Sequence, residues 1–353
     1  MILTNAICCP GVGWASGCNS IRLKRREFIT LLGGATAWSI AAQAQEHGKI
    51  RSVGVLMNSV TTDTEYQSRL AAFVQGLRQL GWTEGQNLRL DVRWSASDAR
   101  LARAYAAELI RLMPDVILAA TTLNLTVMQQ ATSTMPVVFV QVADPVKQGF
   151  VASLRKPGGN LTGFSLFEFS LGGKWLGLLK DVVPGLARVA VMFNPETSPQ
   201  TKFFMSAIEA EAPSLGVQVI PLPVKSFAEI EPALANLSAQ SNIGLIPLPD
   251  IFLDMNAPQI AELVSRYRVP TIGNIARGWK NDVLMIYGND VKLIDQFRQS
   301  ASYIDRILKG AKPSDLPIQG ADNFVLIVNR KAAKMLGLTV PERLLGTADE
   351  VIE

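Results

Sequence analysis

The chain has 353 residues, with 34 Lys and Arg, 30 Asp and Glu, and one His. All three cysteines and four of the basic residues lie within residues 1–44, so the rest of the chain is nearly neutral and contains no cysteine. This composition excludes thiol nucleophiles and thiolate metal sites after residue 44, and it gives no charge-based reason to expect nucleic-acid binding. His47 alone cannot supply a His-metal cluster, so we expect no metal, no cofactor and no catalytic role.

Residues 24–44 have the three parts of an export signal. A positive segment that includes Arg25-Arg26 precedes an apolar core over residues 28–41, and Ala42-Gln43-Ala44 is a small-x-small cleavage motif. The core is shorter than the roughly 20 apolar residues that a membrane span needs. The twin arginine resembles a Tat signal, with an ordinary Sec signal as the alternative. We therefore predict cleavage between Ala44 and Gln45 and a periplasmic location.

Predicted strands and helices alternate through the first half of the remaining chain. Apolar or alternating runs predict strands over 51–57, 87–94, 115–120 and 136–140. Helical spacing predicts helices over 65–80, 99–113 and 123–132. This β-α-β order predicts a parallel sheet that is covered by helices on both faces.

The same pattern of elements repeats in the second half. The predicted strands cover 188–193, 217–222, 243–248, 270–273, 283–287 and 324–328. The predicted helices cover 169–183, 199–212, 227–240, 257–267, 293–309 and 330–336. No long linker separates the halves, so the sequence predicts two α/β lobes, each with a doubly wound parallel sheet, that are joined by a hinge.

Polar residues follow the predicted strands at the edge where open α/β sheets bind ligands. They are Asn58, Ser59, Thr121, Thr122, Asp144, Ser165, Asn194, Asp250, Asn274 and Tyr287. Each also has a purely structural explanation, because Thr122 can cap a helix and Asp144, Asn194 and Asp250 adjoin prolines as turn residues do. Their occurrence in both halves predicts one shared ligand-binding cleft.

A small zwitterion fits these residue types. The free N–H groups of a helix that starts near Thr121-Thr122 suit a carboxylate, and an aspartate across the cleft suits an ammonium group. Tyr66, Phe164 or Tyr287 could stack on the ligand or simply pack in the core. The chain contains no GxxxxGK[ST] or GxGxxG motif, so the sequence gives no sign of a nucleotide site.

Several segments together resemble ABC-transporter solute-binding proteins, in the branch related to tryptophan- and tyrosine-binding periplasmic proteins. They include KRREFITLLGG, FVQGLRQLGWTEGQNLRLDVRW, VVFVQVADPVKQGFVASLRKPGGNLTGFS and YIDRILKGAKPSDLPIQ, and the resemblance covers residues 45–353. Asp144 lies in the V-x-D-P-V loop of this family, Thr121-Thr122 at its helix start, Asn194 in its N-P turn and Asp250 in its P-x-D motif. Here Ile251 follows that aspartate, where tryptophan binders have asparagine.

The resemblance implies the type I periplasmic-binding fold, with three crossings between the lobes and a small-molecule ligand between them. On this basis we assign residues 45–164 and 288–320 to lobe 1, and residues 165–287 and 321–353 to lobe 2. The implied partners are an amino acid or aromatic-acid-like solute and an inner-membrane complex of permease and ATPase, with the receptor itself a monomer. A ligand-sensing receptor domain and an enzyme on the same fold are the alternatives.

Overall fold

The computed structural model describes residues 50–274, 279, 282–289, 293–320 and 324–353. The predicted export signal and cleavage site lie outside these residues. Within the described ranges, no helix is both long enough and apolar enough to cross a bilayer.

Five strands form the first sheet, all of them parallel, in the spatial order β2-β1-β3-β4-β5. They are β1 (Arg51–Met57), β2 (Leu88–Trp94), β3 (Val116–Ala120), β4 (Val137–Ala143) and β5 (Leu161–Phe167). The helices on this sheet are α2 (Thr64–Gln79), α3 (Ala99–Arg111), α4 (Thr121–Ala131) and α10 (Leu293–Leu308), which is followed by the 3-10 helix η1 (Pro313–Asp315). We call these elements the first lobe.

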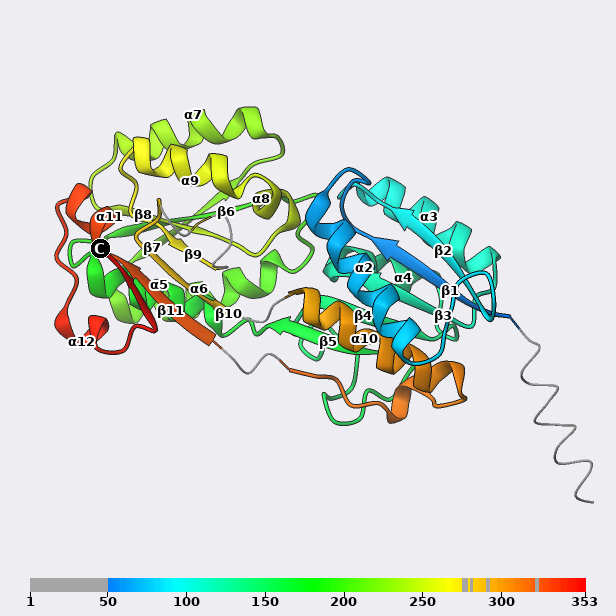
Figure 1. Cartoon of the computed structure of the whole chain (residues 1–353). Helices are drawn as coiled ribbons and strands as arrows, with labels where there is room; N and C mark the ends of the chain where they lie inside the picture. The colour runs from blue at the N-terminus through cyan, green and yellow to red at the C-terminus, as the bar shows by residue number, and fades with distance from the viewer. Residues whose placement is uncertain (1–49, 275–278, 280–281, 290–292, 321–323) are drawn as a thin grey trace, which may run out of the picture. The chain divides into compact units, whose positions relative to one another are not determined.

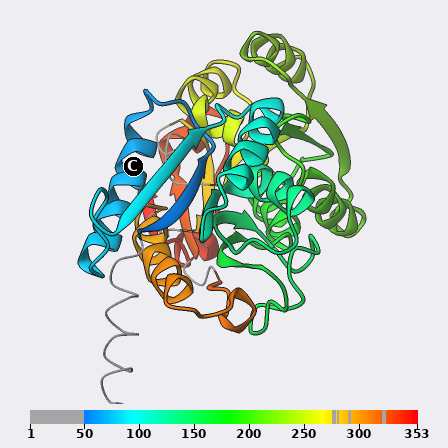
Figure 2. The ribbon, with the colours of Figure 1, turned by 90° about the vertical axis from the view of Figure 1, so that its right-hand side faces the viewer.

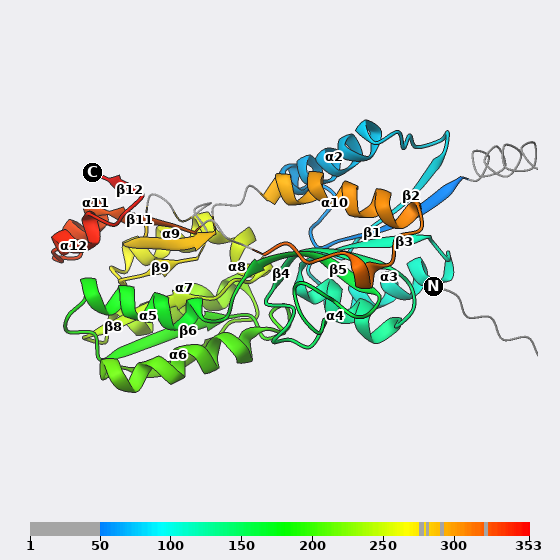
Figure 3. The same cartoon turned by 90° about the horizontal axis from the view of Figure 1, so that it is seen from below.

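The first sheet is buried on both faces because successive residues of its strands face different helices. Val55 packs in a cluster with Phe73 of α2 and Phe297 of α10, while its neighbour Leu56 packs in a second cluster with Leu109 of α3. Helices α2 and α10 lie side by side on one face, and α3 and α4 cover the other (Figures 2 and 3). The continuous apolar runs of β1, β3 and β4 are the sequence signature of this arrangement.

The second lobe contains the remaining sheets. Its strands are β6 (Arg188–Phe193), β7 (Gln218–Pro223), β8 (Ile243–Pro247), β9 (Ile272–Gly273), β10 (Met285–Asn289), β11 (Phe324–Asn329) and β12 (Glu350–Ile352). They pair in the orders β7-β6-β8 and β12-β11-β10-β9, and a parallel bridge between Leu245 and Thr271 connects the two sets. All pairs are parallel except β10 with β11.

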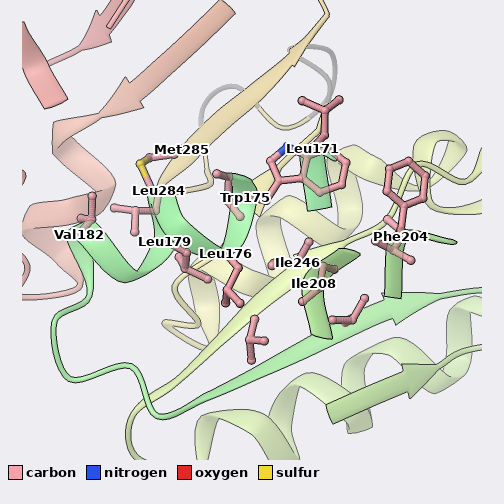
Figure 4. Close-up of a cluster of buried hydrophobic side chains, with 14 of the residues drawn as sticks. Leu171, Trp175, Leu176, Leu179, Val182, Phe204, Ile208, Ile246, Leu284 and Met285 are labelled. Carbon is pink, nitrogen blue, oxygen red and sulfur yellow. The ribbon is translucent and has the colours of Figure 1, made fainter. Parts of the chain in front are cut away.

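The other helices of the described residues belong to the second lobe (Figure 1). They are α5 (Leu171–Val182), α6 (Thr201–Leu215), α7 (Phe227–Ser238), α8 (Ile251–Met255), α9 (Ala257–Arg266), α11 (Arg330–Met335) and α12 (Glu342–Leu345). Figure 4 shows the core between α5, α6 and the sheet, where Trp175 is fully buried and its ring lies 5.5 Å from that of Phe204. The indole Nε1 of Trp175 donates a hydrogen bond to the Tyr287 carbonyl at 2.7 Å, which joins α5 to β10.

The chain passes between the lobes three times: after β5, between β10 and α10, and between Gln319 and β11. Gln319, where the third segment begins, lies beside β5, because the Ser165 N–H donates to Gln319 O and the Gln319 N–H donates to Gly163 O. The exact lobe boundaries, which we placed after residues 164, 287 and 320, stay a prediction. Strand β5 itself continues to Phe167 within the first sheet.

The predicted α/β class and the two-lobed pattern are confirmed, and the differences are local. The strand predicted over 283–287 is observed over Met285–Asn289, and the helix predicted from residue 169 begins at Leu171. Helices α8 and α12 and strand β12 were not predicted, because segments of three to five residues are too short to show a period.

Candidate functional site

A cavity of about 450 Å³ lies between the lobes, at the C-terminal ends of the strands. The first lobe lines it with the start of α2, the start of α4 and the ends of β4 and β5. The second lobe lines it with residues before α6 and with the segment from Pro249 to Pro258, which includes α8. This volume falls in the range of small-molecule sites, about 300–1,000 Å³.

The N-terminus of α4 forms one wall of this cavity, through Thr121, Thr122 and Leu123. No side chain caps this helix end, whose N-cap residue is Ala120. The Thr122 hydroxyl instead accepts a hydrogen bond from the Ala143 N–H at 3.2 Å, which ties the helix start to the end of β4. Uncapped N–H groups and the positive end of a helix dipole suit an anionic group of a ligand.

Two residues of this wall have left-handed backbone conformations, which residues other than glycine rarely adopt. Thr121 has φ 74° and Gln141 has φ 59°. Gln141 lies where the register of β4 against β5 shifts between Phe139 and Val142, so the strand carries a bulge there. The Thr121 hydroxyl and the Gln141 Oε1 are both buried without a hydrogen-bond partner among the described residues. Strain combined with unpaired polar atoms is typical of a ligand clamp.

The start of α2 contributes a cation to the cavity. Asp63 caps the helix by accepting the Glu65 and Tyr66 N–H groups, and it also accepts the Ser59 hydroxyl at 2.7 Å. One turn later Arg69 pairs with Glu65 and lies over the Tyr66 ring, with its Cζ atom 4.2 Å from the ring centroid. Burial raises the pKa of Tyr66 to about 12, so the phenol stays neutral.

Asp250 organises the wall of the second lobe. Its carboxylate accepts hydrogen bonds from the Phe252 N–H at 2.7 Å, the Asn194 N–H at 3.1 Å and the Thr197 hydroxyl at 2.7 Å. It therefore caps α8 and also fixes the loop after β6. Burial outweighs these hydrogen bonds and raises the pKa of Asp250 to about 6.

Asp254 lies one helical turn after Asp250, on α8, and also lines the cavity. Among the described residues its carboxylate has no hydrogen-bond or ion-pair partner. Burial and the neighbouring charge of Asp250 raise the pKa of Asp254 to about 8, although the cation of Arg69 acts in the opposite direction. Nearby, Gln200 donates its Nε2 to the Pro249 carbonyl at 2.7 Å, and its Oε1 is buried and unpaired.

The structure brings three of the ten predicted site residues into the lining of the cavity: Thr121, Thr122 and Asp250. Ser59 and Asn194 support that lining through their bonds to Asp63 and Asp250. The other five residues lie outside it and bond to other parts of the fold. They are Asn58, Asp144, Ser165, Asn274 and Tyr287.

Each of these five residues has a structural partner, although the Asn58 Nδ2 and the Asn274 Oδ1 are buried without a hydrogen-bond partner among the described residues. The Asn58 Oδ1 accepts the Ser95 hydroxyl, Ser165 donates to the Val142 carbonyl, and Asn274 donates to the Pro247 carbonyl. Asp144 accepts the Lys147 N–H in a turn, as the alternative explanation of this residue anticipated. Tyr287 stacks on Phe324 at 6.1 Å and lies under the Lys174 ammonium group.

Sequence reasoning missed four lining residues: Arg69 and Asp254 on helices, Gln141 in the bulge of β4, and Gln200 at the N-cap of α6. The sequence suggested Tyr66 either as a ligand contact or as a core residue, and Tyr66 lines the cavity. One signal was available, because Asp254 follows Asp250 by four residues and therefore lies on the same face of any helix there. The side-chain direction of the others depends on tertiary packing.

We expect Asp250→Ala to lower the free energy of unfolding by about 2 kcal/mol, because three buried or partly buried donors lose their acceptor. Removing a buried charge offsets part of this loss. Chemical denaturation at pH 7 measures the effect. The matched control is Asp98→Ala, which removes a cap of the same kind from the exposed start of α3. A loss no larger than in this control would contradict the organising role of Asp250.

Comparison with known proteins places this geometry in context. The sequence model of a family described as ABC transporter substrate binding protein matches residues 53–352. The tyrosine-binding protein of Clostridioides difficile (strain R20291) is 22% identical over 266 residues, which is 75% of this chain and 75% of that protein.

Solved structures share the fold. A conserved domain protein from Vibrio cholerae is 25% identical, with a TM-score of 0.73, and the match covers 86% of this chain and 100% of that chain. The ABC domain of Streptococcus pneumoniae in complex with L-Trp is 22% identical, with a TM-score of 0.72, and the match covers 86% and 99% of the two chains. These similarities, and one to an ABC transporter solute-binding protein of Bacillus halodurans with a TM-score of 0.53, confirm the predicted type I periplasmic-binding fold.

Proposed function

This chain belongs to the family of ABC transporter substrate-binding proteins, and on that premise we propose that it is the exported receptor of an ABC importer. In this role it binds a small organic solute, an amino acid or an aromatic-acid-like molecule, in the periplasm. It then delivers the solute to a permease and ATPase complex in the inner membrane. The observation that carries the proposal is the cavity between the lobes, whose lining residues from both lobes carry buried polar atoms with no hydrogen-bond partner among the described residues.

The chemistry of the two walls supports a zwitterionic solute. The α4 N-terminus at Thr121 and Thr122 offers N–H groups to a carboxylate, while the opposite wall presents the Asp254 carboxylate. The names of the relatives agree with this class, since one is called a tyrosine-binding protein and another was solved with L-Trp.

Closure of the lobes would couple binding to transport. Met255 of α8 already approaches the first lobe, with its sulfur 3.9 Å from the Ser59 hydroxyl and 3.9 Å from the Ser97 hydroxyl. A solute that contacts both walls stabilises only the conformation in which the walls are close, so it shifts the population toward the closed form. A permease can then distinguish the loaded receptor from the empty one.

Solute binding is expected to stabilise the purified protein. A ligand present at 100 times its dissociation constant adds about 2.7 kcal/mol, which raises the melting temperature of a protein of this size by about 4 °C. A thermal-shift screen of amino acids, aromatic acids and sugars, followed by calorimetry of each hit, measures this effect. If no small solute shifts the melting temperature, the receptor proposal fails, and if a hit is recovered chemically altered, the enzyme alternative gains support.

A further inference from the structure

We propose that the cavity selects solutes that carry a cationic N–H group, and that Asp254 and Gln200 of the second lobe bind this group. The inference rests on the proposed function, because it names the chemical class of the solute and the residues that decide it. It differs from a general preference for amino acids, since it makes the ammonium group, rather than an aromatic ring or the carboxylate, the required feature.

The charge of the cavity lining is the first argument. Among the described residues, Asp63, Glu65, Asp250 and Asp254 line the cavity, and Arg69 is the one cationic residue in that lining. Three of these acids have defined structural partners, because Asp63 caps α2, Glu65 pairs with Arg69 and Asp250 caps α8. Asp254 remains as a carboxylate without a hydrogen-bond or ion-pair partner among the described residues.

Gln200 is the second and independent argument. Its side chain is only 6% exposed, and its Nε2 is already committed to the Pro249 carbonyl at 2.7 Å. The orientation of the amide is thereby fixed, and its Oε1 is left as a buried acceptor that finds no donor within the described part of the chain. An unpaired buried acceptor is costly, so a solute N–H that satisfies it gains affinity.

Gln200 and Asp254 are held on one wall by the same short segment. Gln200 binds the carbonyl of Pro249, and the next residue, Asp250, caps the helix that carries Asp254. Gln141 adds a third unpaired acceptor from the first lobe. Several acceptors on residues that line one cavity favour a solute with several N–H donors, and a protonated primary amine supplies three.

The aromatic lining of the cavity is small by comparison. Of the lining residues that the structure describes, only Tyr66 and Phe167 carry aromatic rings. One face of the Tyr66 ring is already covered by the Arg69 guanidinium group, at 4.2 Å. A flat ring on the solute would therefore find few partners, whereas a cation meets an unpaired carboxylate.

Matched sets of probes test the proposal by calorimetry. One set is L-tyrosine, tyramine, which lacks the carboxylate, and 3-(4-hydroxyphenyl)propionate, which lacks the amine. The other set is L-arginine, agmatine and 5-guanidinopentanoate, in which the guanidinium group stays as a second cation. We expect amine-bearing members of at least one set to bind. In the tyrosine set, removal of the amine should weaken binding at least about 30-fold, which matches the loss of a charged hydrogen bond.

Two variants complete the test, with the intact protein used throughout. Asp254→Asn and Gln200→Leu should each lower the affinity for the amine. For Asp254→Asn we expect a loss of at least about 30-fold. Glu84→Gln, the same charge change on an exposed residue outside the cavity, should leave the affinity unchanged. Binding of the deaminated carboxylate as tightly as the amine, or unchanged amine affinity in Asp254→Asn, would overturn the inference while leaving the receptor role intact. If neither these probes nor the broader screen gives any ligand, the receptor proposal fails as well.

Discussion

Gly163→Ala is expected to lower the free energy of unfolding by about 3 kcal/mol or more, because both the space and the backbone at this position exclude a side chain. A Cβ atom at Gly163 would lie 2.0 Å from the Phe139 carbonyl oxygen and 2.6 Å from its backbone nitrogen. The residue also has φ 150°, in the region that side chains rarely adopt. Strand β5 could accept alanine only by moving away from β4.

The damage should extend from the sheet to the cavity. Phe139 directly precedes the bulge of β4, and this bulge sets the position of Gln141 in the cavity wall. Gly163→Ala should therefore weaken solute binding in whatever fraction of the protein still folds.

Urea denaturation followed by circular dichroism measures the loss of stability. Gly159→Ala is the matched control, because no atom lies within 4 Å of a Cβ atom there and the backbone does not have a positive φ. We expect the control to change stability by less than about 0.5 kcal/mol. Equal stabilities of the two variants would mean that β4 and β5 pack less closely than the structure indicates.

The sequence was sufficient for the fold because burial leaves a direct record in it. The apolar runs of β1, β3 and β4 are typical of strands covered on both faces, and their alternation with helical periods favours a parallel sheet. By contrast, Gly163 gave no sign of its importance, because a single glycine in a strand does not reveal which backbone it approaches.

The site was predictable only where it depends on chain order. Thr121 directly follows β3, and Asp250 comes shortly after the end of β8. The rule that ligands bind at strand ends therefore identified both residues. Arg69 lies in α2, and Gln200 is the N-cap residue of α6. The direction of each side chain is set by the packing of its helix against the rest of the lobe. No local pattern distinguishes them from ordinary surface residues, so their role emerges only from the three-dimensional arrangement.

The pair Asp250 and Asp254 should make the stability of the ligand-free protein fall as pH rises. Their folded pKa values, about 6 and about 8, lie above the ordinary value of 3.8. The folded state therefore holds more protons than the unfolded state between about pH 4 and pH 8, so the free energy of unfolding decreases with pH across this window. We expect a loss of about 1–3 kcal/mol from these two groups between pH 5 and pH 8, after allowance for solvent screening.

The variant Asp254→Asn isolates the larger shift. It removes the carboxylate that interacts electrostatically with Arg69, Tyr66 and Asp250. The decline in the free energy of unfolding above pH 6 should therefore become less steep, and the free energy of unfolding at pH 8 should rise. Denaturation of both proteins at pH 5, 6.5 and 8, with Asp98→Asn as the exposed control, measures the difference. Parallel pH profiles for wild type and Asp254→Asn would show that Asp254 titrates normally.

The same linkage gives a signature of the bound cation. An ammonium group beside Asp254 favours the ionised carboxylate, so binding must lower its pKa and release a proton near pH 7. Calorimetry in buffers of different ionisation enthalpy counts this proton, which should disappear in Asp254→Asn. Affinity for the amine should also rise with pH up to about 8, the value to which burial and Asp250 raise the pKa of Asp254. Proton uptake on binding, or affinity that falls over this range, would place the cation away from Asp254.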